Sequence, residues 1–133
     1  MLLKKIETQK APKALGPYSQ AIALNVTQGL IFVSGQLPID PETGKLIAGD
    51  IKALTKQVID NLEAILNEAG SRLEFVVRTE VFLLDLKDFA AMNEEYSRRF
   101  SGKATPARQT IQVAGLPMNS PIEISCIATA DIN

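Results

Sequence analysis

Hydrophobic residues recur every three or four positions in two segments of the chain and alternate with polar residues in several others. Between Asp50 and Gly70 the apolar stripe has the helical period, and these two residues suit an N-cap and a C′ position. The stripe comprises Ile51, Leu54, Val58, Leu62, Ile65, Leu66 and Ala69. This pattern predicts one long amphipathic helix.

A second helical stripe follows Asp85 and stops near Gly102. It comprises Leu86, Phe89, Asn93, Tyr96 and Phe100, at spacings of three and four residues. Asn93 is the polar exception on this apolar face. Such an amide is more often a buried group bonded to backbone than a ligand contact, and both interpretations stay open.

Runs of β-branched, aliphatic and aromatic residues, bounded by Gly, Pro, Asn and Asp, predict strands. They cover residues 4–7, 21–25, 30–34, 75–84, 107–113 and 122–130. A Gly-containing turn at 25–29 predicts a hairpin of the second and third strands. Residues 11–18 and 35–45, rich in Pro and Gly, are expected to be loops.

The order of these elements predicts an α+β fold, a mixed β-sheet with two helices packed on one face. If the fourth strand directs Val77, Val81 and Leu83 toward the helices, its other face carries Arg78, Glu80, Phe82 and Leu84. The third strand is apolar on both faces. Because two helices cannot cover both faces, we expect the open face to pack against another subunit.

The composition is that of an ordinary globular protein, and we expect a single domain over residues 1–133. A net charge of −1 without a basic stripe makes nucleic acid an unexpected partner, and no long apolar run predicts a membrane span. The chain has no histidine, which removes the usual general base and most zinc sites. One cysteine, Cys126, is expected in the core and favours a reducing, cytoplasmic location.

Arg108 and Glu123 are the residues that suggest chemistry. The period of two places Arg108 and Thr110 on one face of strand 107–113. If the loop 114–121 returns the chain antiparallel, Glu123 shares that face. The pair is then either a structural ion pair at a subunit interface or a site. In a site, the planar guanidinium grips an anionic substrate while the carboxylate handles water.

Four short motifs occur in a set order: GPYSQ at residues 16–20, VSGQLP at 33–38, PAR at 106–108 and IEI at 122–124. Together they resemble the RidA/YjgF family, in its branch with an imine-deaminase arginine. The similarity extends over residues 6–130, nearly the whole chain.

The resemblance implies a chorismate-mutase-like fold assembled as a homotrimer, with a pocket at each subunit interface. It also implies hydrolysis of 2-imino and 2-enamino acids, 2-aminoacrylate and 2-iminobutanoate, to 2-oxo acids and ammonia. Pyridoxal-phosphate-dependent dehydratases release these intermediates. No metal or organic cofactor is implied for the hydrolase itself.

Carried over to this chain, the resemblance makes Arg108 the carboxylate-binding residue and Glu123 the residue that orients or activates water. The pocket is then lined by Tyr18, Ser34, Gly35, Asn93 and the backbone at Thr110. Without the resemblance, Tyr18 is more often a packed loop aromatic. Many relatives have a cysteine in place of Thr110 and a small residue in place of Gln109. Substrate range therefore stays open, while Gln109 points away from Arg108.

Two other functions remain. Relatives have been described as ribonucleases and translation inhibitors, but this chain has no histidine, no basic stripe and few aromatic residues. A non-catalytic regulator that binds small carboxylates would need Arg108 alone. Glu123 favours hydrolysis over mere binding.

Overall fold

The computed structural model describes residues 3–10, 13–14, 16–24 and 29–130. The strands are β1 Leu3–Ile6, β2 Ala21–Leu24, β3 Leu30–Gln36, β4 Ile39–Asp40, β5 Lys45–Leu46, β6 Val76–Leu83, β7 Ala107–Gln112 and β8 Ile122–Thr129. The α-helices are α1 Ile51–Glu68 and α2 Phe89–Arg99. Short 3₁₀ helices are η1 Leu73–Phe75, η2 Leu86–Asp88 and η3 Pro117–Asn119.

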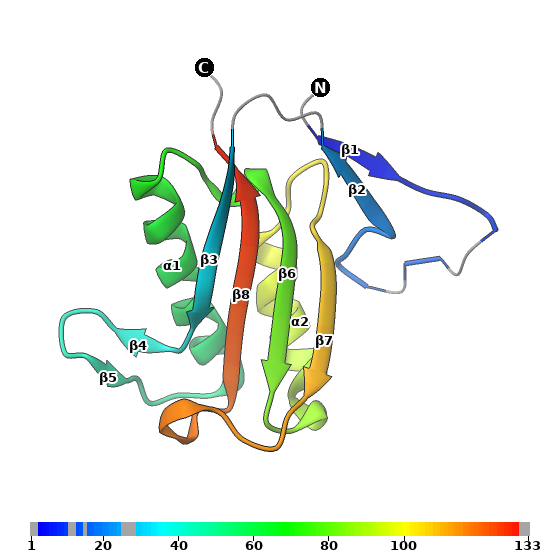
Figure 1. The fold of residues 1–133 in the computed structure, drawn as a ribbon. Coiled ribbons are helices and arrows are strands. Elements are labelled where there is room, and N and C mark those ends of the chain that lie inside the picture. Colours follow the sequence, from blue (N-terminus) through cyan, green and yellow to red (C-terminus); the bar gives the residue numbers. More distant parts are fainter. Residues whose placement is uncertain (1–2, 11–12, 15, 25–28, 131–133) are drawn as a thin grey trace.

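The central sheet has the strand order β3-β8-β6-β7. β6 and β7 are parallel and are joined through α2, whereas β8 runs antiparallel to both β3 and β6. Figure 1 shows both α-helices behind this sheet, α1 toward β3 and α2 toward β7. The predicted α+β fold, a mixed sheet with two helices on one face, is confirmed.

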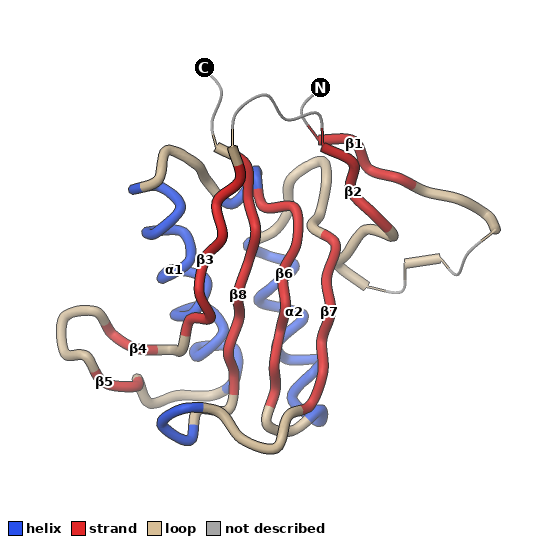
Figure 2. Tube along the Cα trace, viewed as in Figure 1, coloured by secondary structure: helices blue, strands red, loops and turns tan. Residues whose placement is uncertain are grey.

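The predicted hairpin of the second and third strands is wrong. β2 pairs with β1, and β3 pairs with β8, the last strand of the chain. A turn signal shows only that the chain reverses and does not determine which strands pair. In the structure β3 lies beside the aliphatic β8, and both strands contact α1. Residues 25–28 of that turn lie outside the described residues. The expected loop 35–45 contains a small hairpin, β4 with β5 (Figure 2).

The first predicted helix is confirmed at both ends. The Asp50 side chain accepts a hydrogen bond from the backbone N–H of Ala53 at 2.9 Å, and Gly70 has a φ of +79° after the last turn. The buried stripe is shifted from the predicted one: Ile59 is fully buried, whereas Ile65 is 39% exposed.

The second helix starts one turn later than predicted. Asp85 caps the 3₁₀ helix η2 by accepting from the N–H of Lys87, and α2 then begins at Phe89. Because a 3₁₀ turn has a different period, the stripe changes phase: Met92 is fully buried, whereas Leu86 is 45% exposed. The core lies between sheet and helices, and its largest fully buried side chains include Ile59, Leu62, Leu66, Leu83, Met92, Tyr96, Ile122 and Ile124.

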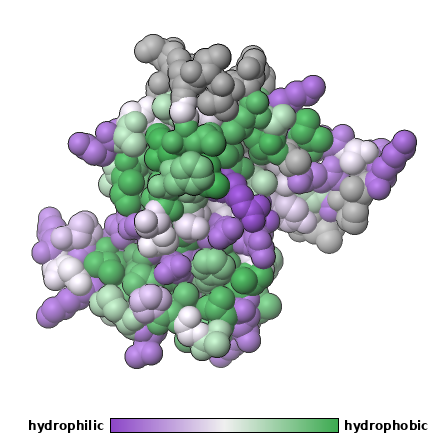
Figure 3. Space-filling model, viewed as in Figure 1, coloured by the Kyte–Doolittle hydropathy of each residue, from purple (hydrophilic) through white to green (hydrophobic). Residues whose placement is uncertain are grey.

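The other face of the sheet is left open within the chain. Along β6, side chains facing the helices are buried while Arg78, Glu80 and Phe82 remain partly exposed. Phe32 on β3 is 71% exposed. Figure 3 looks onto this face, where hydrophobic areas lie above and below a polar band. Within the described part of the chain, no helix has both the length and the hydropathy to cross a membrane.

Candidate functional site

Arg108 lies on β7 with its side chain on the helix side of the sheet. Its register partner on β6 is Thr79, which is fully buried beneath α2. The guanidinium Nη1 donates a hydrogen bond to Oδ1 of Asn93 at 2.6 Å. Burial lowers the pKa of Arg108 below its usual value. No carboxylate among the described residues forms an ion pair with this guanidinium, so its charge is not neutralised there.

Three aromatic rings surround the Arg108 guanidinium. Its carbon lies 4.9 Å from the ring centroid of Tyr96, 5.5 Å from that of Phe89 and 5.7 Å from that of Tyr18. Ring faces attract a cation without accepting its in-plane N–H groups. The rings therefore stabilise the charge of Arg108, and N–H groups in the plane of its guanidinium remain available to bind an anion.

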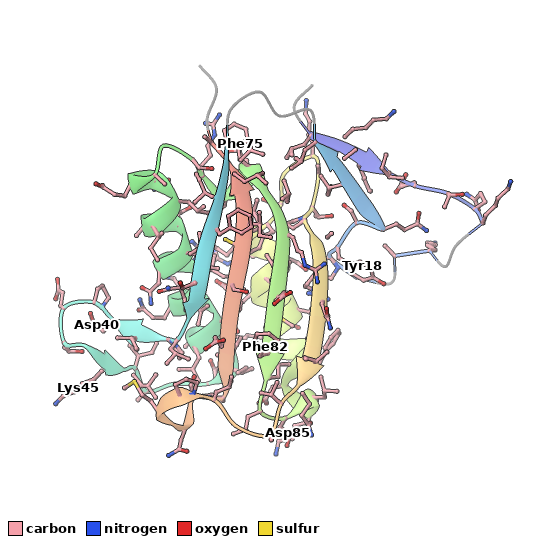
Figure 4. The ribbon with its side chains drawn as sticks, viewed as in Figure 1. Tyr18, Asp40, Lys45, Phe75, Phe82 and Asp85 are labelled. Atoms are coloured by element: carbon pink, nitrogen blue, oxygen red, sulfur yellow. The ribbon has the colours of Figure 1, made fainter. Side chains whose placement is uncertain are left out.

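The loop that carries Tyr18 is fastened to the start of β7. The backbone N–H of Ser19 donates to the carbonyl of Pro106 at 3.1 Å, and the Ser19 hydroxyl donates to the carbonyl of Thr105. Ser19 is only 2% exposed. Figure 4 shows Tyr18 beside β7. These bonds explain why a GPYSQ segment, distant in sequence, contributes a ring to the environment of Arg108.

Glu123 lies on the opposite face of the sheet, so the prediction that it shares a face with Arg108 is wrong. That prediction assumed that β8 pairs with β7, but β6 lies between them. The register places Glu123 in one row with Phe82 and Ile111, which face away from the helices. Arg108 is in the row of the buried Thr79, which faces α2.

The Glu123 carboxylate lies directly over Gly35. A Cβ atom at Gly35 would be 2.5 Å from Oε2 of Glu123, closer than real Cβ contacts come. Gly35 belongs to an irregularity in the pairing of β3 with β8, where the register shifts between Val33 and Gln36. Glu123 makes no side-chain hydrogen bond and no ion pair within the described residues. The Glu123 carboxylate can lie here because Gly35 has no side chain.

The predicted site residues fall into two groups. The arginine cluster, on the helix side at the β7 edge, comprises Tyr18, Asn93, Arg108 and Thr110. The glutamate cluster, at β3 and β8 on the open face, comprises Ser34, Gly35 and Glu123. In the arginine cluster, the Thr110 hydroxyl is buried and has no hydrogen-bond partner among the described residues. The two clusters do not meet within one chain.

Sequence reasoning missed two members of this environment, Phe89 and Tyr96. Both are one helical turn from Asn93, which places all three on one face of α2. Aromatic residues at helical spacing usually belong to a core, so the stripe by itself predicts only that they are buried. Cys126 is 4% exposed, as expected for a core residue, and burial raises its pKa to about 12. Among the described residues, no three Asp, Glu or Cys side chains are grouped to hold a metal ion.

Comparison with known sequences agrees with this architecture. The family model described as Endoribonuclease L-PSP matches residues 8–130. The chain belongs to this family. It is 53% identical over 128 residues to a RutC family protein of Pyrococcus abyssi, covering 96% of this chain and 98% of the relative. It is 48% identical over 124 residues to the chloroplastic Reactive Intermediate Deaminase A of Arabidopsis thaliana, covering 93% of this chain and 64% of that protein.

Solved structures of family members have the same fold. The YjgF gene product of E. coli superposes with a TM-score of 0.73 at 42% identity, covering 96% of this chain and 99% of that one. E. coli TdcF, solved with bound serine, gives a TM-score of 0.72 at 40% identity, with the same coverage. The resemblance to RidA/YjgF proteins is thereby confirmed.

Proposed function

We propose that this protein hydrolyses 2-aminoacrylate and 2-iminobutanoate, in their enamine and imine forms, to 2-oxo acids and ammonia. The observation that carries the proposal is the environment of Arg108. Its guanidinium is partly buried among three rings, has one neutral hydrogen-bond partner and has no carboxylate partner among the described residues. A small anionic substrate would supply the missing charge.

The carboxylate of a 2-imino acid fits the planar fork of a guanidinium. Two parallel, charge-assisted hydrogen bonds fix both the position and the orientation of the carboxylate, and therefore of the carbon beside it. Asn93 accepts from one nitrogen of Arg108 and so limits rotation of the fork. The name of the Arabidopsis relative and the serine bound to TdcF both support a small amino-acid-derived substrate.

Hydrolysis then requires one positioned water. The enamine form first becomes the imine by transfer of a proton from its nitrogen to the β-carbon. Water then adds to the imine carbon, the carbinolamine collapses, and ammonia leaves as the carbonyl of the 2-oxo acid forms. A carboxylate within reach of that water accepts its proton and returns it to the departing nitrogen. We assign this role to Glu123. No metal or organic cofactor takes part in these steps, and we place the reaction in the cytoplasm.

Glu123 cannot act beside Arg108 of its own chain, because the two side chains lie on opposite faces of the sheet. We therefore infer that the site is completed between copies, the glutamate cluster of one chain meeting the arginine cluster of another. The open sheet face supports such an assembly, since Phe32 is 71% exposed and Leu30 is 43% exposed. The expected assembly is a homotrimer.

The family description also names an endoribonuclease. A ribonuclease of the usual kind needs a general acid and base near neutral pH, and this chain has no histidine and a net charge of −1. A regulator that binds small carboxylates would share the arginine cluster. The regulator hypothesis does not explain why the Glu123 carboxylate lies in the space that Gly35 leaves.

The assay that tests the proposal couples this protein to a pyridoxal-phosphate-dependent dehydratase fed with serine or threonine. The time course of 2-oxo acid release is followed with and without the protein, at equal dehydratase turnover. We expect faster release and less inactivation of enzymes sensitive to the free enamine. No acceleration, together with tight binding of pyruvate, would favour the regulator. Cleavage of RNA by the same preparation, abolished in Glu123→Gln, would favour the ribonuclease.

A further inference from the structure

Tyr96 provides the ring closest to the Arg108 guanidinium, and the sequence alone marks it only as a core residue. We propose that Tyr96 is a positioning residue for Arg108, and that the hydroxyl of Thr79 fixes the ring of Tyr96. This inference rests on the proposed function, in which Arg108 binds the substrate carboxylate. Neither Tyr96 nor Thr79 contacts the substrate in this arrangement.

Tyr96 is held at both ends. Its side chain is fully buried, and its Oη lies 2.7 Å from Oγ1 of Thr79 on β6, within hydrogen-bond distance. Its ring packs against Phe100 with centroids 4.5 Å apart and planes tilted by 31°. A ring anchored by both a polar and an apolar contact has one preferred orientation. Tyr96 therefore presents a fixed face to the guanidinium.

The strand register joins these contacts into one unit. Thr79 is the β6 partner of Arg108 on β7, so both residues stand in the same row of the sheet. β7 supplies the guanidinium of Arg108, and the neighbouring β6 supplies the Thr79 hydroxyl that orients the ring of Tyr96. Tyr96 comes from α2, as does Asn93, the hydrogen-bond acceptor for Nη1. A shift of Tyr96 would therefore move the ring contact and disturb the helix face that carries Asn93.

The chemistry of Tyr96 suits a support. Burial raises its pKa to about 12, so the phenol stays neutral and keeps its hydrogen bond at any pH at which the reaction is measured. A neutral ring attracts the guanidinium through its face and does not compete for the in-plane donors, as a carboxylate would. A carboxylate at the same place would occupy the fork that the substrate needs.

Two substitutions test the contacts among Arg108, Tyr96 and Thr79 without removing the charge of the guanidinium. Tyr96→Phe keeps the ring and deletes the hydroxyl, and Thr79→Val deletes the other hydroxyl without touching the guanidinium. For each we expect a roughly threefold to tenfold rise in KM and in the Kd for pyruvate, with kcat nearly unchanged, because a loosened fork weakens substrate and transition state alike. The double variant should be no worse than the single ones, since they break one shared bond. Thr79→Ser, which retains the hydroxyl, should restore wild-type affinity.

Thr55→Val is the matched control. Thr55 is also fully buried, and its hydroxyl donates to the Ile51 carbonyl within α1 at 2.6 Å. It undergoes the same chemical change outside the arginine cluster, so any loss of stability should leave pyruvate affinity unchanged. All titrations are made well below the melting temperature of each variant.

The outcomes separate this inference from the proposed function. If Thr79→Val and Tyr96→Phe bind pyruvate as tightly as Thr55→Val does, the positioning role is overturned, whether or not the enzyme is a deaminase. Failure of Thr79→Ser to restore affinity would overturn it too. If the wild-type protein does not accelerate 2-oxo acid release in the coupled assay, the proposed function fails instead. Weak pyruvate binding in both Tyr96→Phe and Thr79→Val, together with normal binding in Thr79→Ser, supports the positioning role.

Discussion

The arginine cluster and the glutamate cluster are built in different ways. Arg108 is held by its own chain, through the hydrogen bond that it donates to Asn93 on α2, three rings and a loop fastened to the start of β7. Glu123 lies on the open face, placed by the irregularity in β3 and by the space that Gly35 leaves. The arginine cluster is assembled by contacts within a single chain, whereas the glutamate cluster faces outward from the open side of the sheet.

The difference follows from how each charge tolerates burial. A guanidinium is weakly hydrated and is stabilised by ring faces, so it can be partly buried without an ion pair. A carboxylate has no such alternative and needs N–H or O–H donors when water is removed. Glu123 accordingly lies at a partly exposed surface, which the proposed assembly would cover with a second chain. Substrate binding should depend on the first cluster and turnover on both.

The largest effect is expected from Arg108→Ala. Each charge-assisted bond to the substrate carboxylate contributes about 1.5–3 kcal/mol, so losing two should lower kcat/KM at least a hundredfold. Circular dichroism and light scattering should show an unchanged fold and assembly. Arg108→Lys should recover little, because an ammonium cannot reproduce the planar fork. An alanine variant with nearly normal activity would remove Arg108 from the site.

Glu123→Gln should separate turnover from binding. Glutamine keeps the shape of the side chain but loses the charged acceptor, so kcat should fall by about a hundredfold or more. The Kd for pyruvate, measured by calorimetry, should change less than about threefold because the arginine cluster remains intact. Equal losses of binding and turnover would instead make Glu123 a structural partner of Arg108 from the neighbouring chain.

Gly35→Ala tests the placement of that carboxylate. The added methyl would lie 2.5 Å from Oε2 of Glu123, so the side chain must rotate away. We expect kcat to fall roughly tenfold, a smaller loss than in Glu123→Gln because the charge is displaced rather than removed. Gly102→Ala is a matched control, since a Cβ atom at Gly102 would lie 3.9 Å from its nearest neighbour, the Cγ of Glu74. A normal kcat for Gly35→Ala would show that the position of Glu123 is not critical.

Thr110→Val should have the smallest effect on activity. It should make the protein more stable while weakening substrate binding. Removing a buried hydroxyl without a partner should raise the free energy of unfolding by about 1 kcal/mol. If the hydroxyl bonds the substrate when the site is occupied, KM should rise at the same time. Denaturant unfolding and steady-state kinetics measure the two. Lower stability would show that a second chain already satisfies Thr110.

Much of the fold could be predicted from local patterns. The caps at Asp50 and Gly70 and the stripe between them identified α1, and alternation identified β6, β7 and β8. Pairing could not be read in this way. β8 is inserted between β3 and β6, which depends on which faces bury apolar area together rather than on neighbouring residues. The predicted β2–β3 hairpin failed for that reason.

The motifs name the proposed site residues, but they do not give the arrangement of these residues. Whether Arg108 and Glu123 share a face depends on the number of strands between them and on the register, neither of which a period of two determines. Tyr96 and Phe89 had a signal, their helical spacing from Asn93. Aromatic residues at that spacing usually form a core, and in Tyr96 a fully buried ring also supports the arginine.

The central claim is that the two clusters of one site come from different chains. Co-expression of Arg108→Ala and Glu123→Gln under two affinity tags, followed by tandem purification, isolates mixed assemblies. Each inactive chain supplies the residue that the other lacks, so about a third of the sites in a mixed trimer should be intact and active. Assemblies of either variant alone should stay inactive. A tandem-purified mixture with no more activity than its parents would contradict the account.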